Sequence, residues 1–176
     1  MLNLIKKVPL AVAFIMITTA SNVSAHNVCS YPCPCVSQIE EVEEIDEDSA
    51  EASEFAQEVL ELVNIEREKA GVRPLKLSDD LTELANIRAE EIVEVFSHTR
   101  PDGRSCFSIL SGINYRTCAE NIAAGSATPE KVVEQWMNSA GHRANILNGA
   151  YRYLGVGYTY DEDAMYEHYW VQLFIG

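Results

Sequence analysis

The stretch Leu154-Gly155-Val156-Gly157-Tyr158-Thr159-Tyr160 has the two-residue period of a β-strand. A second run of this kind, residues 166–174, follows after the acidic turn at 161–164. Two such runs joined by a short polar turn predict an antiparallel hairpin at the end of the chain. The fold class then depends on what precedes this hairpin.

Three helical patterns lie before the hairpin. The first starts with Ser53 as an N-cap and stops at Gly71; the second starts after Ser78 and runs to residue 96. The third starts at Thr128-Pro129, a capping hydroxyl followed by proline at the first helical position. Residues 119–123 predict a further strand. Helices first and strands last indicate an α+β fold, with helices stacked on a small sheet.

An acidic run precedes the first helix. Residues 40–54 hold nine carboxylates and no Lys or Arg, so like charges repel and few apolar side chains are present to offset the entropy of ordering. We therefore expect residues 26–54 to be a Cys-containing, acidic, disordered linker and residues 55–176 to be the folded domain. That domain has 11 basic and 18 acidic side chains, a net charge of −7, which makes nucleic acid an unfavourable partner.

The N-terminus has the pattern of an export signal. Lys6 and Lys7 precede an apolar stretch from 8 to 20, which is short for a permanent membrane span. Val23-Ser24-Ala25 supplies the small residues that a signal peptidase requires. We expect a signal peptide at residues 1–25, cleavage after Ala25, and a secreted mature chain with no permanent membrane span. An uncleaved anchor is the alternative.

The five cysteines form two groups. Cys29, Cys33 and Cys35 precede the acidic run, and their pairing is left open because an odd count cannot all pair internally. Cys106 and Cys118 enclose a short loop within the domain, and we expect these two to form a disulfide, since an exported chain can keep one.

Several stretches carry a resemblance to a known family. They are FSHTRPDG at 96–103, AENIA at 119–123 and WMNSAGHRANIL at 136–147, with LGVG at 154–157 and YWVQLF at 169–174. In this order and spacing they resemble the bacterial branch of the CAP superfamily, which includes cysteine-rich secretory, antigen 5 and pathogenesis-related proteins and is also called the SCP-like extracellular domain. The resemblance implies a three-layer α-β-α sandwich with a small, mainly antiparallel sheet.

The resemblance also implies a site. In this family two histidines and two glutamates line a central cleft, and in some members the histidines bind a divalent metal such as zinc. His98 and His142 match the histidines, and Glu120 matches the first glutamate. Neutral imidazoles are good zinc ligands, and a carboxylate beside them can orient an imidazole or hydrogen-bond a bound water. A purely structural role for all three residues is the alternative.

The second glutamate of the family is missing from its usual place. Ser139 stands there, three residues after Trp136. Glu134 is a tempting substitute, but it lies about 140° round the helix from Ser139 and away from the apolar face. We expect Glu134 to be solvated and Ser139 to be a possible cleft residue. His168 is expected to be a satisfied strand residue.

Two functions are compatible with these patterns. The first is an extracellular binding or interaction module for a lipid, glycan or protein ligand. The second is a metal-dependent hydrolase of peptide or cell-wall substrates, with Glu120 as base. Neither an HExxH nor a GxSxG motif is present, and no established catalytic motif appears. The sequence therefore favours the non-enzymatic module.

Overall fold

The computed structural model describes residues 47–176, with side chains from Glu51 onward. The predicted signal peptide, its cleavage after Ala25, the cysteines at 29, 33 and 35 and most of the expected linker lie outside these residues. The described chain has four α-helices, one 3₁₀ helix and four strands. The helices are α1 (Glu47–Lys69), α2 (Asp79–Glu94), η1 (Cys106–Leu110), α3 (Pro129–Asn138) and α4 (Ala140–Ile146), and the strands are β1 (Lys76–Leu77), β2 (Cys118–Ala124), β3 (Tyr153–Tyr160) and β4 (His168–Ile175).

The strands form one sheet in the order β1-β3-β4-β2. The predicted hairpin of β3 and β4 is antiparallel and lies at the centre; β2 pairs with β4 antiparallel, and β1 pairs with β3 in parallel. The sheet is thus small and mainly antiparallel, as expected. Strand β2 lies at an edge of this sheet, so only one side of its backbone pairs with another strand among residues 47–176.

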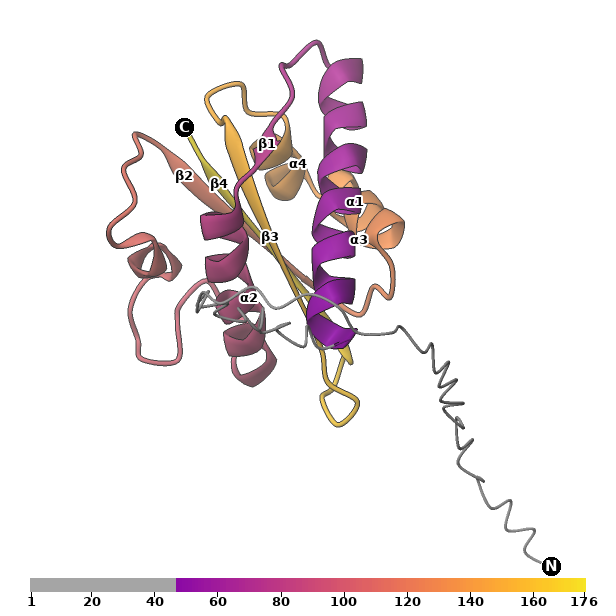
Figure 1. Ribbon diagram of the computed structural model, residues 1–176, viewed down its shortest axis with the longest axis vertical. Coiled ribbons are helices and arrows are strands. Elements are labelled where there is room, and N and C mark those ends of the chain that lie inside the picture. Colours follow the sequence, from indigo (N-terminus) through magenta and orange to yellow (C-terminus); the bar gives the residue numbers. More distant parts are fainter. Residues whose placement is uncertain (1–46) are drawn as a thin grey trace, which may run out of the picture. The chain divides into compact units, whose positions relative to one another are not determined.

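Helices cover both faces of the sheet (Figure 1). On one face α2 and η1 pack against alternate residues of β4, namely Tyr169, Val171, Leu173 and Ile175. On the other face α1, α3 and α4 pack against Trp170 and Phe174 of the same strand. This alternation follows from the two-residue period of a strand that is buried on both sides. The α+β class and the three layers predicted from the sequence are confirmed.

Two glycines of β3 let α2 lie directly on the sheet. A Cβ placed on Gly155 would lie 2.3 Å from the backbone of Leu81, and one on Gly157 would lie 2.1 Å from the carbonyl oxygen of Ala85. The gap between β3 and α2 at these two positions therefore admits no side chain larger than the hydrogen atom of glycine. The amide of Tyr158 donates to the side chain of Asn86 on α2 at 3.2 Å, which sets the helix along the strand. This contact positions α2 on the sheet.

The predicted helix starts were right for two of three helices. Ser78 caps α2 and Thr128 caps α3, each side chain accepting a hydrogen bond from a backbone amide three residues later. The first helix starts at Glu47, so the prediction that Ser53 is its N-cap was wrong. Residues 47–54 of the acidic run are helical, because Ala and Glu are good helix formers and carboxylates are stabilised at a helix N-terminus.

Three short elements were not predicted. They are β1, η1 and α4, of two, five and seven residues. In particular, His142 lies inside α4, a helix that the sequence analysis did not predict. None of the described helices is both long enough and apolar enough to cross a membrane.

Candidate functional site

The cleft residues lie around the edge strand β2, whose neighbouring residues point to opposite faces of the sheet. Glu120 points to the α2 face, where it contacts His98; Asn121 points to the other face, where it contacts α4, the helix of His142. Successive side chains of a strand alternate in this way. The dipeptide Glu120-Asn121 of β2 therefore contacts the loop of His98 on one face of the sheet and the helix of His142 on the other.

His98 is positioned by a loop that returns to α2 and η1. Its carbonyl oxygen accepts a hydrogen bond from the Cys106 amide at 3.0 Å. The next turn is closed by Asp102, which accepts from the amide of Arg104 at 2.9 Å, and Gly103 has a φ of 82°. An aspartate that accepts backbone donors in this way stabilises a tight turn.

The carboxylate of Glu120 is the centre of the α2 side of the site. Its side chain is 1% exposed. Oε1 lies 2.8 Å from Nδ1 of His98, and Oε2 accepts from Nε of Arg88 at 2.9 Å. The thiol of Cys106 is a further hydrogen-bonding neighbour of Glu120. The carboxylate charge is thus compensated by a buried guanidinium.

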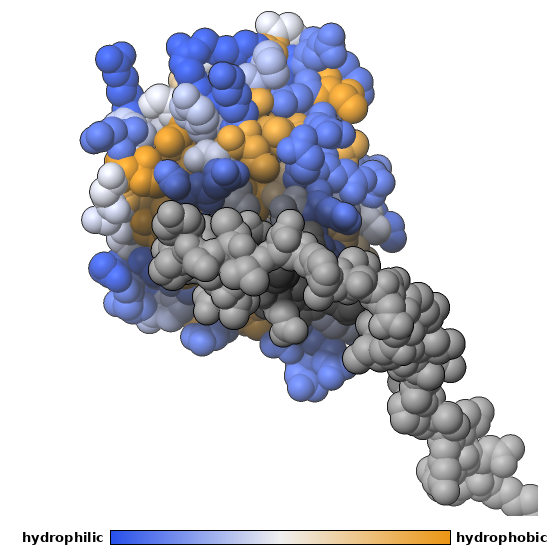
Figure 2. All heavy atoms as spheres, viewed as in Figure 1, coloured by the Kyte–Doolittle hydropathy of each residue, from blue (hydrophilic) through white to orange (hydrophobic). Residues whose placement is uncertain are grey.

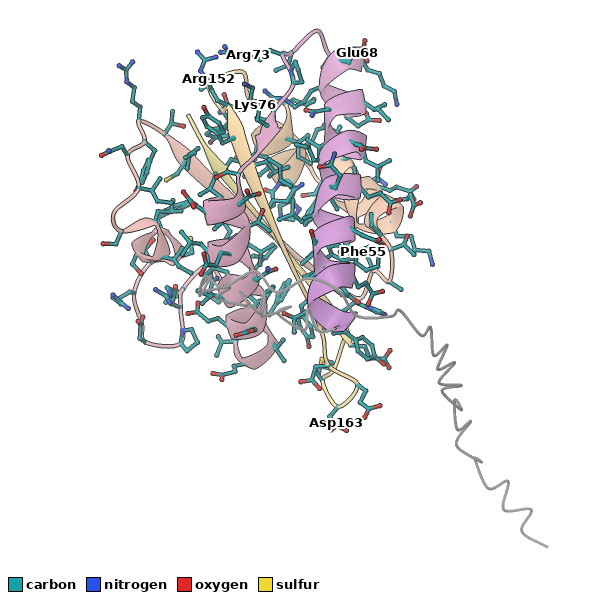
Figure 3. The ribbon with its side chains drawn as sticks, viewed as in Figure 1. Phe55, Glu68, Arg73, Lys76, Arg152 and Asp163 are labelled. Atoms are coloured by element: carbon teal, nitrogen blue, oxygen red, sulfur yellow. The ribbon has the colours of Figure 1, made fainter. Side chains whose placement is uncertain are left out.

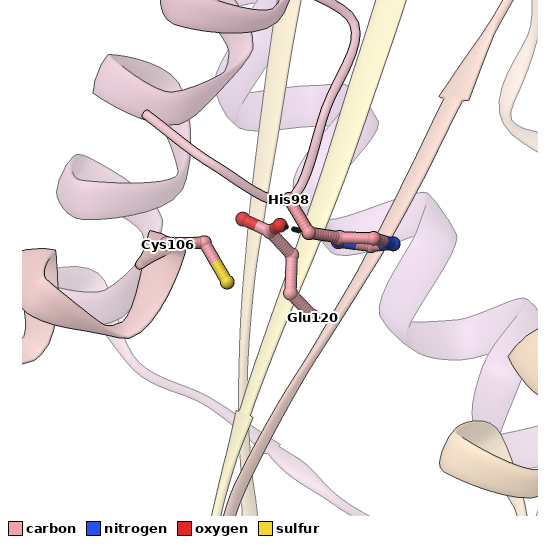
Figure 4. Close-up of side chains that lie close together, drawn as sticks. All are labelled: His98, Cys106 and Glu120. Atoms are coloured by element: carbon pink, nitrogen blue, oxygen red, sulfur yellow. Dashed lines mark hydrogen bonds and ion pairs between the residues drawn. The ribbon is translucent and has the colours of Figure 1, made fainter. Parts of the chain in front are cut away.

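The bond to Glu120 fixes the orientation of His98. Nδ1 faces the carboxylate, and Nε2 makes no hydrogen bond to any residue that the structure describes. Figure 4 shows the ring extending away from Cys106. The His98 side chain is 56% exposed, so this nitrogen is accessible. A cysteine–histidine nucleophile pair is not formed, since the ring does not turn its free nitrogen towards the thiol.

Arg88 is the functional residue that the sequence analysis missed. It is fully buried, and besides Glu120 it donates to Glu91 and to the carbonyl of Ser97, the residue before His98. Glu91 in turn accepts from Arg100 at 2.9 Å. A signal was present, because an arginine on the apolar face of a helix requires a buried carboxylate partner.

On the other face an amide network holds α4. Nδ2 of Asn121 donates to the carbonyl of His142 at 3.2 Å and to Oε1 of Gln172 at 3.0 Å, while Nδ2 of Asn145 donates to Oδ1 of Asn121 at 2.8 Å. Asn121 and Gln172 are opposite each other in the sheet and fully buried. Asn145 therefore ties the segment after α3 to the core.

His142 has a buried ring nitrogen without a partner. Its Nδ1 makes no hydrogen bond within the described residues. Burial lowers the pKa of His142, and the nearby charge of His98 lowers it further. His142 is therefore favoured in the neutral form, which is the form that binds metals.

A cavity of about 380 Å³ opens over this edge of the sheet. Its lining includes His98, Glu120, Cys106, Cys118 and Asn145. One ligand atom from each of His98, Cys106 and Glu120 lies within 4.8 Å of the others. His142 and Ser139 do not line this cavity; Ser139 separates α3 from α4 and makes no side-chain capping bond.

The remaining predicted residues are also placed. Glu134 is exposed and lines a groove between α1 and α3, so the helical-wheel prediction is confirmed. His168 shares a 2.8 Å hydrogen bond with the hydroxyl of Tyr158 and is a satisfied strand residue, as expected. Cys106 and Cys118 are both free thiols in the structure, although they face the same cavity.

A family comparison agrees with this arrangement. Residues 60–174 match the model of the CAP family, described as the cysteine-rich secretory protein family. The chain belongs to the CAP family. Its match to the uncharacterized protein YkwD of Bacillus subtilis is 40% identical over 126 residues, covering 69% of this chain and 47% of that protein. The uncharacterized membrane protein YlbC of the same species is 33% identical over 105 residues, covering 57% of this chain and 30% of that protein. The chain thus spans less than half of these relatives.

Solved structures show the same CAP fold. An extracellular protein of Bacillus anthracis with an SCP domain superposes with a TM-score of 0.64 at 26% identity, covering 74% of this chain and 44% of that one. An outer surface protein of Borrelia burgdorferi superposes with a TM-score of 0.59 at 23% identity, covering 74% and 95%. Both neighbours are described as extracellular or outer surface proteins.

Proposed function

We propose that this CAP-domain protein is exported and acts as an extracellular binding module whose cleft holds a divalent metal, such as zinc, through His98 and His142. In this proposal Glu120 does not bind the metal but orients His98. When bound, the metal supplies a Lewis-acidic contact for a ligand oxygen. The ligand is a lipid, glycan or protein outside the cell.

One observation carries the proposal: the 2.8 Å contact between Nδ1 of His98 and Oε1 of Glu120. Metal-binding histidines commonly donate their other ring N–H to a carboxylate, which fixes the tautomer and raises the basicity of the free nitrogen. His98 has this arrangement, with an accessible Nε2. The position of Glu120 is fixed in turn by the buried Arg88.

The orphaned nitrogen of His142 supports the same role. A buried polar atom without a hydrogen bond costs roughly 1 to 3 kcal/mol, so such atoms are rare unless a ligand or water satisfies them. Nδ1 of His142 is an atom of this kind. Each histidine therefore has an uncommitted ring nitrogen. The two flank β2 from opposite faces and His142 is not part of the lining of the His98 cavity, so the proposed metal would be bound around this edge of the sheet and not inside that cavity.

Export is supported by the sequence signature that ends at Ala25 and by the extracellular description of similar proteins. The hydrolase alternative receives no such support from the geometry. The Glu120 side chain is 1% exposed and its carboxylate is paired with Arg88 and His98, whereas a general base must reach the water that it activates. We therefore propose binding, not hydrolysis, as the function.

Calorimetry with zinc on metal-free protein tests this proposal. His98→Ala and His142→Ala should each abolish most of the binding, whereas Glu120→Gln should weaken it about 10-fold to 100-fold as the loss of an orienting partner. His168→Ala is the matched control, because its ring is bonded to Tyr158. Glu134→Ala should also leave the affinity unchanged. If His98→Ala and His142→Ala both bound zinc with wild-type affinity, the proposal would be overturned.

We further propose that Cys106 and Cys118 pair after export. Both thiols face one cavity, and the loop between them is short. Closing such a loop stabilises the fold by about 3 kcal/mol in the chain-entropy estimate. Peptide mapping of exported protein without reductant should recover the two cysteines as one linked pair. Recovery of both as free thiols would contradict the pairing.

A further inference from the structure

A second cavity, of about 200 Å³, lies away from the His98 cleft and is lined by Arg73, Pro74, Lys76, Arg152 and Tyr153. Four other cavities in the described part of the chain each have at least one carboxylate in their wall. This cavity has three cationic side chains and no carboxylate. We call these three cations the basic cluster.

The backbone brings the basic cluster together. Lys76 of β1 is paired in register with Tyr153 of β3, and the amide of Lys76 donates to the carbonyl of Arg152 at 3.0 Å. Arg73 lies in the segment that leads into β1, and its Nη2 donates to the carbonyl of Gly149 at 3.1 Å. Figure 3 shows the three side chains at one end of the sheet, and the same end is mainly hydrophilic in Figure 2.

The charges of the basic cluster are not neutralised within the described residues. None of the three forms an ion pair with a carboxylate there. The side chains of Lys76 and Arg152 make no hydrogen bond in the same part of the chain, and Arg73 makes one. Lysine has three N–H donors and arginine five, so most donors of the basic cluster remain available.

We propose that the basic cluster binds the phosphate group of a small, hydrophilic ligand. A phosphate presents several strong acceptor oxygens and up to two negative charges, which three cations can match, and arginine binds such groups through two parallel hydrogen bonds. Tyr153 is 43% exposed and, with Pro74, adds an apolar surface to the same cavity. This surface suits the ring of a sugar attached to the phosphate.

The whole chain is acidic, so the basic cluster can attract an anion only at short range. The formal net charge is −14, so the long-range field repels anions. Exposed charges farther apart than about 8 to 10 Å are largely screened at physiological salt. Binding must therefore come from direct contacts in the cavity, and the affinity should depend on individual cations of the basic cluster.

Calorimetry at constant ionic strength, with orthophosphate and glucose 6-phosphate as separate probes, tests this proposal. Lys76→Gln and Arg152→Gln should each weaken phosphate binding about tenfold or more, as expected for loss of a charged hydrogen bond. Lys131→Gln is the matched control, because Lys131 is exposed on α3 and lines none of these cavities. Surface substitutions of this kind should not change folding stability measurably.

The two probes distinguish the source of the phosphate. Tighter binding of glucose 6-phosphate than of orthophosphate would identify a phosphorylated sugar as the ligand, and equal binding would identify phosphate itself. Saturable binding of neither probe below about 10 mM would overturn the proposal. An equal loss of affinity with Lys131→Gln would also overturn it, because the attraction would then be unspecific.

Discussion

At the scale of single residues, the carboxylate of Glu120 contacts side chains from three different segments. They are Arg88 of α2, His98 of the following loop and Cys106 of η1. The ion pair with Arg88 is the buried one, with side chains 0% and 1% exposed. Removing one partner of a buried pair leaves an uncompensated charge, which is much more costly than removing both. This asymmetry gives a test of the interaction.

We predict that Arg88→Met destabilises the domain by about 3 to 5 kcal/mol, as measured by urea unfolding. The variant keeps an unbranched side chain close in length to the aliphatic part of arginine but leaves Glu120 buried without its cation. Arg88→Met combined with Glu120→Leu should recover much of this loss, because no charge then remains buried. A loss below about 1 kcal/mol for the single variant would show that solvent reaches Glu120.

The cysteine in the cleft gives a second prediction at this scale. Burial, followed by the charge of Glu120, raises the pKa of Cys106 to about 12. The thiolate is the reactive form, so in the reduced, folded protein Cys106 should resist iodoacetamide at pH 8 and react only after unfolding. Mass spectrometry of the alkylated peptide measures this. Rapid labelling of Cys106 in the folded protein would contradict the prediction.

The sequence predicted individual site residues only in part. His98, His142 and Glu120 were selected because of the family resemblance, and two of them, His98 and Glu120, are in direct contact. Arg88 was missed because its partner Glu120 lies 32 residues away in the chain, so its place on the apolar face of the helix does not show which carboxylate it contacts. Asn121 and Gln172 were missed for the same reason: their contact joins strands 51 residues apart in the chain.

At the scale of elements, the close packing of α2 on β3 positions the helix that carries Arg88, the partner of Glu120. We predict that Gly157→Ala destabilises the domain by well over 1 kcal/mol, since the added methyl group would overlap the backbone of α2. Circular dichroism during thermal unfolding measures this. Gly141→Ala in α4 is the matched control: nothing lies within 4 Å of its added Cβ, and alanine favours a helix by about 0.5 to 1 kcal/mol. Equal stability of both variants would contradict the close packing.

The ion pairs at the end of α2 predict a pH dependence. Burial opposes ionisation of Glu91, but hydrogen bonds from Arg100 and Arg88 outweigh it and hold its pKa below the usual value. A lowered pKa means that this stabilisation is fully present above about pH 4.3, the value for an unfolded chain, and is lost as the pH falls through the folded pKa.

Urea unfolding at pH 7 and pH 3 should therefore show a smaller difference in stability for Glu91→Gln than for the wild type. Glu134→Gln is the control, because Glu134 is exposed and makes no ion pair in the described residues. Glu134→Gln should show the same difference in stability between pH 7 and pH 3 as the wild type. An unchanged difference in Glu91→Gln would mean that Glu91 does not contribute to acid sensitivity.

Long elements were predicted better than short ones. Helices α2 and α3 have clear caps, and β3 and β4 have a strand period over eight residues each. Elements β1 and α4 are too short for a period to be visible, and they form because of tertiary contacts: β1 pairs with β3, and α4 is held by the amide network around Asn121. The early start of α1 shows that an acidic run can be helical where it begins a helix.

At the scale of the whole molecule, the CAP fold brings residues from distant parts of the chain to the free edge of one sheet. His98, Glu120 and His142 come from a loop, a strand and a helix, and all three lie within the residues that match the family model. The chain covers only 47% of its Bacillus subtilis relative YkwD, so the likeness concerns the domain and not the whole relative.

X-ray absorption of the zinc-loaded protein tests the central claim most directly, because it reads the ligands of the metal. Zinc to nitrogen bonds are about 2.0 to 2.1 Å long and zinc to sulfur bonds about 2.3 Å, so the two donors are distinguishable. The account predicts two imidazole ligands and no sulfur, with one imidazole lost in His98→Ala and one in His142→Ala. A sulfur ligand at about 2.3 Å would contradict it and would instead place the metal at the thiol of Cys106, beside Glu120.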